Sequence, residues 1–142
     1  MSLLDADTSK IVHAWVDGRP FFLDVEEVEC GHLLDKRVAH RVREAIKAAR
    51  EDGLSVSIIS AWRSMEEQEH LYNCWRQGLK GYNPADQPGH SKHQEGLAID
   101  LAFKDATERE RFAALAVAHG GNRPIHREPW HWVFTPSPEE ST

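Results

Sequence analysis

Two short segments rich in potential metal ligands constrain this chain more than any other feature. Residues 91–100 read Ser-Lys-His-Gln-Glu-Gly-Leu-Ala-Ile-Asp, and residues 128–131 read Glu-Pro-Trp-His. A catalytic zinc site takes three protein ligands from His, Asp, Glu or Cys and leaves the fourth position to water. We therefore predict that each chain binds one Zn²⁺ ion through His93, Asp100 and His131.

The residues around Asp100 alternate as a strand does. Residues 97–103 place their large apolar side chains at every second position, namely Leu97, Ile99, Leu101 and Phe103. Strand residues alternate faces, so Asp100 lies on the opposite face, where small neighbours leave space for a metal and a substrate. Residues 130–134 also read as a strand, on which His131 points away from two tryptophans that we expect in the core. A neighbouring strand can thus direct His131 at the same ion.

Together the two segments resemble the signature of the zinc D-Ala-D-Ala carboxypeptidases and dipeptidases. The pattern Ser-x-His-x-x-Gly-x-Ala-x-Asp followed by Glu-x-Trp-His is complete at Ser91, His93, Gly96, Ala98, Asp100, Glu128, Trp130 and His131. The same superfamily includes phage L-alanyl-D-glutamate endolysins, lysostaphin-type peptidases and the hedgehog domain. Residues 60–64 with Gln68 resemble a further family segment, whose arginine (here Arg63) holds a substrate carboxylate. The resemblance covers residues 54–134 and implies a zinc peptidase that acts on peptidoglycan stem peptides.

Glu128 and Arg63 have the chemistry that hydrolysis of such a peptide needs. Glu128 precedes His131 by three residues, so its carboxylate can take a proton from water near the metal and deliver it to the leaving amine. The planar fork of Arg63 can bind a substrate carboxylate through two parallel hydrogen bonds. The alternative for Arg63 is a structural salt bridge. Ser91 can hydrogen-bond the same substrate carboxylate or hold its loop in shape.

Other polar residues near the motifs are weaker candidates for substrate binding. Gln68 either supports the site or lies on a helix surface. His126, two residues before Glu128, is a candidate to stabilise the oxyanion of a tetrahedral intermediate. Residues 79–92 are polar and rich in turn formers, and we expect this long loop to form one wall of the cleft, with His90 lining it or lying on the surface.

Cap and turn residues divide the rest of the chain. The predicted elements are hairpin strands over 11–16 and 21–25, a strand over 54–61, and helices over 35–52, 64–78 and 107–118. We expect the exposed basic face of the first helix to be solvated; it carries Arg37, Arg41, Lys47 and Arg50. The second helix should bury a stripe of Leu71, Tyr72 and Trp75. The fold class we predict is α+β, hedgehog/D-Ala-D-Ala-peptidase-like, with an antiparallel sheet that carries zinc on one face and helices on the other.

Length and charge narrow the possible functions further. The 142 residues suit one zinc peptidase domain over 1–134, followed by a polar tail over 135–142 that we expect to be disordered. The net charge of −6 gives no basic footprint for a nucleic-acid partner. No apolar run approaches the roughly 20 residues of a membrane span, and no secretory signal is visible. The chain is expected to be made in the cytoplasm and to act in the cell wall or periplasm.

These expectations favour a D-alanyl-D-alanine carboxypeptidase whose partner is a peptidoglycan peptide. One alternative is an endolysin-like L-alanyl-D-glutamate endopeptidase, because Arg63 can equally hold the carboxylate of a D-glutamate. Another is a zinc-containing binding module without turnover. The presence of both Glu128 and Arg63 argues against a mere binder, which needs no base.

Overall fold

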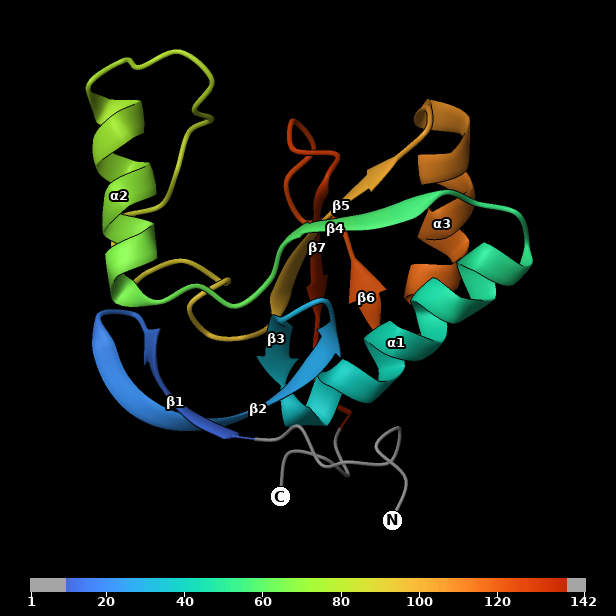
Figure 1. The fold of residues 1–142 in the computed structure, drawn as a ribbon, viewed down its shortest axis with the longest axis horizontal. Coiled ribbons are helices and arrows are strands. Elements are labelled where there is room, and N and C mark those ends of the chain that lie inside the picture. Colours follow the sequence, from blue (N-terminus) through green and yellow to red (C-terminus); the bar gives the residue numbers. More distant parts are fainter. Residues whose placement is uncertain (1–9, 138–142) are drawn as a thin grey trace.

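The computed structural model describes residues 10–137 and shows an α+β fold with two antiparallel sheets (Figure 1). The three-stranded sheet has the order β1 (Lys10–Val16), β2 (Arg19–Glu29), β3 (His32–Asp35). The four-stranded sheet has the order β4 (Val56–Ser60), β5 (Ala98–Phe103), β7 (His131–Phe134), β6 (Gly121–Asn122). The helices are α1 (Lys36–Glu51), α2 (Met65–Arg76) and α3 (Ala106–Ala118). The predicted fold class is confirmed, whereas the end of the predicted tail, 138–142, lies outside the described residues.

The N-terminal hairpin forms where Asp17-Gly18 predicted it. Both turn residues have positive φ, 48° and 79°, as the two-residue turn that matches strand twist requires. β1 pairs with β2 along its whole length, from Lys10 opposite Val25 to Val16 opposite Arg19. Pro20 is tolerated because β3 pairs only with the far end of β2, so no ladder bond to β3 is lost at the proline.

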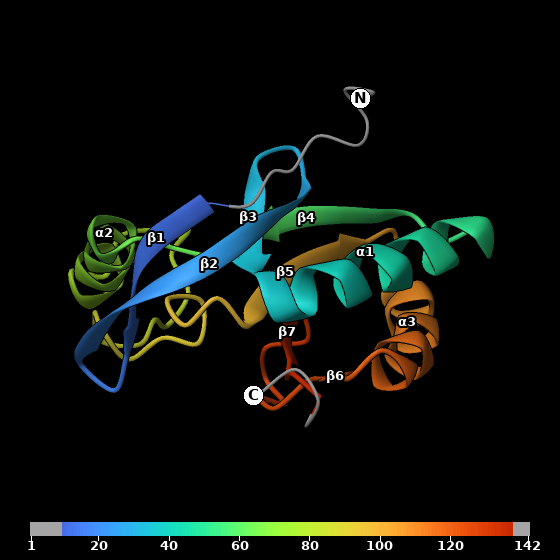
Figure 2. The same cartoon turned by 90° about the horizontal axis from the view of Figure 1, so that it is seen from below.

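Helices α1 and α3 cover the apolar face of the four-stranded sheet (Figures 1 and 2). Asp35 caps α1 by accepting a hydrogen bond from the Arg37 amide at 2.9 Å, as its position before the helix predicted. The buried stripe of α1 comprises Val38, Ala39, Val42, Ala45, Ile46 and Ala49. It meets Ile99 and Leu101 of β5 and Phe112 of α3 in one core. The large side chains of β5 therefore face the helices, which leaves its small-residue face for a site.

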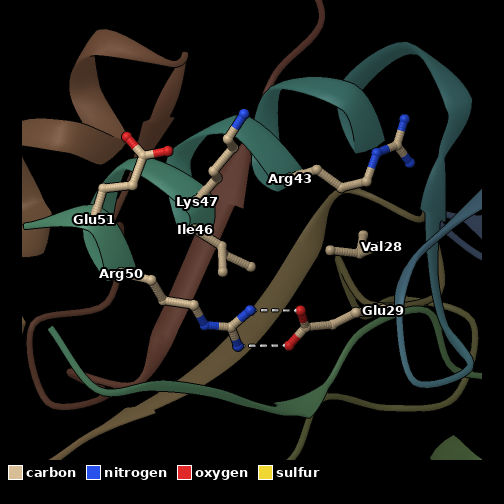
Figure 3. A pocket seen from close by; sticks show the side chains of 7 residues that line it. All are labelled: Val28, Glu29, Arg43, Ile46, Lys47, Arg50 and Glu51. Carbon is tan, nitrogen blue, oxygen red and sulfur yellow. Dashed lines mark hydrogen bonds and ion pairs between the residues drawn. The ribbon is translucent and has the colours of Figure 1, made fainter. Parts of the chain in front are cut away.

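The outer face of α1 is solvated as expected at Arg37, Lys47 and Arg50, which are exposed, but some of its arginines also bind other segments. Figure 3 shows Arg50 joined to Glu29 at a hollow that Val28 and Ile46 also line, and both hydrogen bonds measure 2.8 Å. The Arg41 guanidinium donates to the Thr135 carbonyl at 2.8 Å. This side of the helix thus joins two other segments to α1, and only part of it is free in solvent.

Helix α2 lies apart from the other two helices, beside the hairpin and a long loop (Figures 1 and 2). Ser64 caps it in a capping box with Glu67, as the sequence predicted. Its expected buried stripe is wrong in part, because Leu71, Tyr72 and Trp75 are only half-buried. Among the described residues, no helix is both long and apolar enough to cross a bilayer.

Candidate active site

Strand pairing places two of the predicted ligands opposite each other. β5 and β7 are antiparallel neighbours, and Asp100 faces His131 directly in their register. Gly96 bends the chain just before β5 with φ 82°. This φ strains any residue with a Cβ, and a Cβ here would also lie 2.6 Å from a Leu23 methyl and 3.2 Å from the Asp35 amide nitrogen, so the position favours glycine. The bend brings His93 back to the same face of the sheet.

The three predicted ligands meet in one buried cluster. Ligand atoms of His93, Asp100 and His131 all lie within 4.8 Å of one another. Asp100 Oδ1 is 3.1 Å from both His93 Nε2 and His131 Nδ1. All three residues are at most 7% exposed. This was the one group of three or more metal-type side chains found among the described residues.

The chemistry of the cluster fits a cation. His93 Nδ1 lies 2.8 Å from the Ala61 carbonyl and must donate its hydrogen there, which leaves the lone pair of Nε2 facing Asp100. Burial lowers the pKa of His93, which favours the neutral ring. Burial acts to raise the pKa of Asp100, but its contact with His131 and the charge of Arg63 hold that pKa well below its ordinary value. A lone pair facing a carboxylate is the arrangement that a metal ion between them satisfies.

Arg63 joins the metal-type cluster to helix α2. Its Nη2 donates to Asp100 Oδ2 at 3.1 Å, its Nη1 to Gln68 Oε1 at 3.1 Å, and its Nε to Ser60 Oγ at 2.9 Å. A guanidinium has five N–H donors, so one donor remains on each terminal nitrogen. Arg63 therefore makes the salt bridge that we considered as an alternative and keeps two hydrogens for a substrate.

A cleft of about 520 Å³ opens over the cluster. The predicted loop wall is confirmed, because Tyr82, Asn83, Pro84 and Asp86 line the cleft. The Glu128 side chain lines it too and is half-buried, so it shares the cleft with all three predicted metal ligands.

Ser91 and Gln68 both lie at this cleft, but each is already engaged in holding the chain. Ser91 Oγ accepts from the His93 amide at 3.1 Å. Gln68 is 1% exposed, and its Nε2 donates to the Asp86 carbonyl at 2.9 Å while its Oε1 accepts from Arg63. Gln68 is thus buried behind the site and does not lie on an open helix surface.

The structure does not bring His126 to the cleft. Its side chain is exposed and lines a separate hollow with Arg109, Glu110 and Arg123. His90 is exposed as well, with its ring against the turn at Gly18. The position of His126 two residues before Glu128 did not predict where its side chain points, because residues 123–130 form no strand or helix.

Several cleft residues escaped sequence reasoning. Leu71 and Trp75 of α2, which we expected in the core, line the cleft, as does Arg127. Trp132 is buried as predicted, but Trp130 is half-buried and also lines the cleft. The one sequence signal for Arg127 was its position as a basic residue directly before Glu128.

Comparison of the sequence with known proteins identifies a family for most of the chain. The family model described as VanY, D-alanyl-D-alanine carboxypeptidase, matches residues 31–119. A D-alanyl-D-alanine carboxypeptidase of Enterococcus faecalis is 29% identical in an alignment of 91 residues that covers 56% of this chain and 34% of that protein. The matched part of the chain thus spans about a third of that relative's length.

Solved structures share the fold. VanYB in complex with D-alanine-D-alanine superposes with a TM-score of 0.71 at 20% identity, covering 90% of this chain and 88% of that one. A variant of the vancomycin-resistance D,D-pentapeptidase VanY in complex with Zn(II) gives a TM-score of 0.67 at 22% identity, with 79% and 78% covered.

Proposed function

The chain belongs to the VanY family of D-alanyl-D-alanine carboxypeptidases, and from this premise we propose that it is a zinc peptidase that removes the terminal D-alanine from peptidoglycan stem peptides. The proposal includes His93, Asp100 and His131 as the ligands of one Zn²⁺ ion. It also treats residues 1–134 as one peptidase domain that acts in the cell wall or periplasm.

The observation that carries the proposal is the buried cluster at the base of the cleft. An imidazole lone pair faces a carboxylate 3.1 Å away, and the second imidazole approaches the same oxygen at the same distance. Two neutral histidines and one aspartate would leave a zinc site with a charge near +1. Zinc in such a site supplies a Lewis acid that polarises a carbonyl and lowers the pKa of water towards roughly 7.

Glu128 is the group we propose as general base and acid. Glu128 precedes His131 by three residues, and its side chain lines the same cleft as the cluster. In this role it accepts a proton from the attacking water and passes that proton to the amine that leaves. It needs no direct bond to the metal, and Arg63 attracts its negative charge from across the cleft.

Arg63 is the group we propose for recognition of the terminal carboxylate. Its two remaining N–H donors, one on each terminal nitrogen, match the two oxygens of a carboxylate. Its other donors are held by Asp100, Gln68 and Ser60, so the guanidinium is fixed before substrate arrives. Ser91 lies at the same cleft, where its hydroxyl hydrogen can assist.

A defined stem pentapeptide tests this assignment. We expect the zinc-loaded protein to release free D-alanine, as measured by product masses, and a chelator to stop the release. Glu128→Ala should bind zinc like the wild type but release D-alanine about 10²- to 10⁴-fold more slowly. A cut between L-Ala and D-Glu would replace the proposal with an endopeptidase. A zinc-bound protein that cleaves neither bond would instead be a binding module.

A further inference from the structure

The side chain of Gln94 occupies an unusual place next to the proposed metal site. It directly follows His93, yet it is 0% exposed and is absent from the lining of the cleft. Its Oε1 accepts a hydrogen bond from the Gly89 amide at 2.6 Å, and its Nε2 lies 3.7 Å from Met65 Sδ. A buried amide that reaches neither metal nor substrate is available for a positioning role.

Both backbone polar groups of Gly89, its N–H and its carbonyl, are hydrogen-bonded. Gln94 takes its N–H, while the Gly18 amide at the hairpin turn donates to its carbonyl at 2.8 Å. Gly89 has φ 91°, and a Cβ there would lie 3.4 Å from the Gly18 Cα, so the two backbones are in direct contact. The end of the cleft loop is thereby fixed to the hairpin.

The backbone of Gln94 completes a closed loop around His93. Its carbonyl accepts from the Trp15 amide at 3.2 Å, and its own amide donates to the Ser91 carbonyl at 3.0 Å. The segment 89–94 is therefore tied at its first residue and its last, and His93 lies just inside the second tie. Hairpin residues 10–29 lie outside the part of the chain that the family model matches.

We propose that Gln94 is a positioning residue that holds the 89–94 segment closed through Gly89 and so fixes the direction in which His93 presents Nε2. The inference rests on the proposed function to the extent that His93 binds zinc. Partners that orient a metal ligand from behind typically contribute 10- to 100-fold to metal affinity. Gln94 would do so through the backbone, one residue along the chain from the ligand.

Zinc affinity of the full chain, measured by competition with a chromogenic chelator, tests the proposal. Gln94→Met keeps the volume of the side chain but removes the acceptor for Gly89, and we expect its affinity to fall about 10- to 100-fold. The visible absorption of the Co²⁺-loaded variant should also change, because a reoriented His93 alters the ligand field. Gln94→Asn keeps the amide but withdraws it from Gly89, so it should weaken binding too and serves if Gln94→Met does not fold.

The matched control is Glu108→Met. Glu108 is also buried and also accepts a backbone amide, that of Ser55 at 3.0 Å, but it lies on α3 beyond the far ends of β4 and β5. The Glu108→Met variant should have lower thermal stability than the wild type and the same zinc affinity. Wild-type affinity and an unchanged Co²⁺ spectrum in a folded Gln94 variant would overturn the inference alone. A wild-type chain that binds no zinc would overturn the proposed function and, with it, this inference.

Discussion

Two buried carboxylates, Glu108 at the α3–β4 corner and Asp100 in the centre of the sheet, satisfy their charge in different ways. Glu108 accepts backbone amides, from Ser55 at 3.0 Å and Lys104 at 3.3 Å, and its other oxygen lies 4.0 Å from the ammonium of Lys104. Asp100 has two imidazoles and a guanidinium as its side-chain partners. Both residues are nearly inaccessible. Burial of an acid therefore does not by itself mark a site, whereas two buried imidazoles on one carboxylate oxygen, which can themselves bind a metal, do.

The largest effect that this comparison predicts is at Asp100. Asp100→Asn removes the charge that both histidines face, so we expect zinc affinity to fall by more than about 100-fold, beyond the range typical of residues that only support ligands. Metal content after dialysis measures this, with circular dichroism to show that the variant is folded. Retention of stoichiometric zinc would mean that Asp100 resembles Glu108 after all.

Among the residues that the structure describes, Asp100 has a guanidinium partner, Arg63, and Glu108 has none. Arg63→Lys keeps a positive charge near Asp100 but loses the planar fork. Loss of one charge-assisted hydrogen bond to substrate, worth about 1.5–3 kcal/mol, corresponds to a fall of about 10- to 100-fold in kcat/KM. Steady-state release of D-alanine measures it, and zinc content should stay at one ion per chain. An unchanged kcat/KM would reduce Arg63 to a structural ion pair.

A substitution of Glu108 should reduce stability and leave the metal site and activity unchanged. Glu108→Met leaves two backbone amides without their acceptor, and a buried donor left unsatisfied costs about 1–3 kcal/mol. We expect the free energy of unfolding in urea to fall by that amount while zinc affinity and kcat/KM stay at wild-type values. A loss of zinc would show that the corner and the site are coupled, which the comparison denies.

The smallest effect concerns an exposed ion pair. Arg50 lowers the pKa of Glu29 below its ordinary value of 4.5 through their hydrogen bonds, so the carboxylate adds stability above that value and loses it as pH falls through the lowered pKa. Their side chains are 44% and 31% exposed, and solvent screening limits the pair to about 1 kcal/mol or less. Arg50→Gln should be slightly less stable than wild type at pH 7. Denaturant unfolding should show a smaller difference once Glu29 is protonated, because then only the Arg50 hydrogen bond to the Val56 carbonyl, 2.9 Å long, is lost in the variant. A difference that does not shrink on protonation would locate the whole effect at that carbonyl.

Local patterns predicted the parts of the fold that depend on neighbours in sequence. The caps at Asp35 and Ser64, the turn at Asp17-Gly18 and the faces of β5 follow from backbone chemistry and from a period of two. The meeting of His93, Asp100 and His131 followed from strand faces together with the family resemblance. The assignment of their roles remains a prediction.

Features that depend on packing between distant segments were not predictable in the same way. The two-residue strand β6 has too little sequence to show alternation. The apolar stripe of α2 looks like a core stripe, but in the fold its Leu71 and Trp75 line the cleft. The helix lies apart from α1 and α3, which cover the core (Figure 1). The burial of Gln68 likewise depends on Arg63 and Asp86, which are 5 and 18 residues away.

The direct opposition of Asp100 and His131 across β5 and β7 has a consequence for assembly of the protein. Side chains alternate between faces, so a slip of one residue between these strands would turn the imidazole toward the helices and bury the wrong half of β7. Only the native alignment offers both groups to an ion. Metal binding would then stabilise only chains in which β5 and β7 pair in the native register, so the ion would favour correct pairing of the two strands.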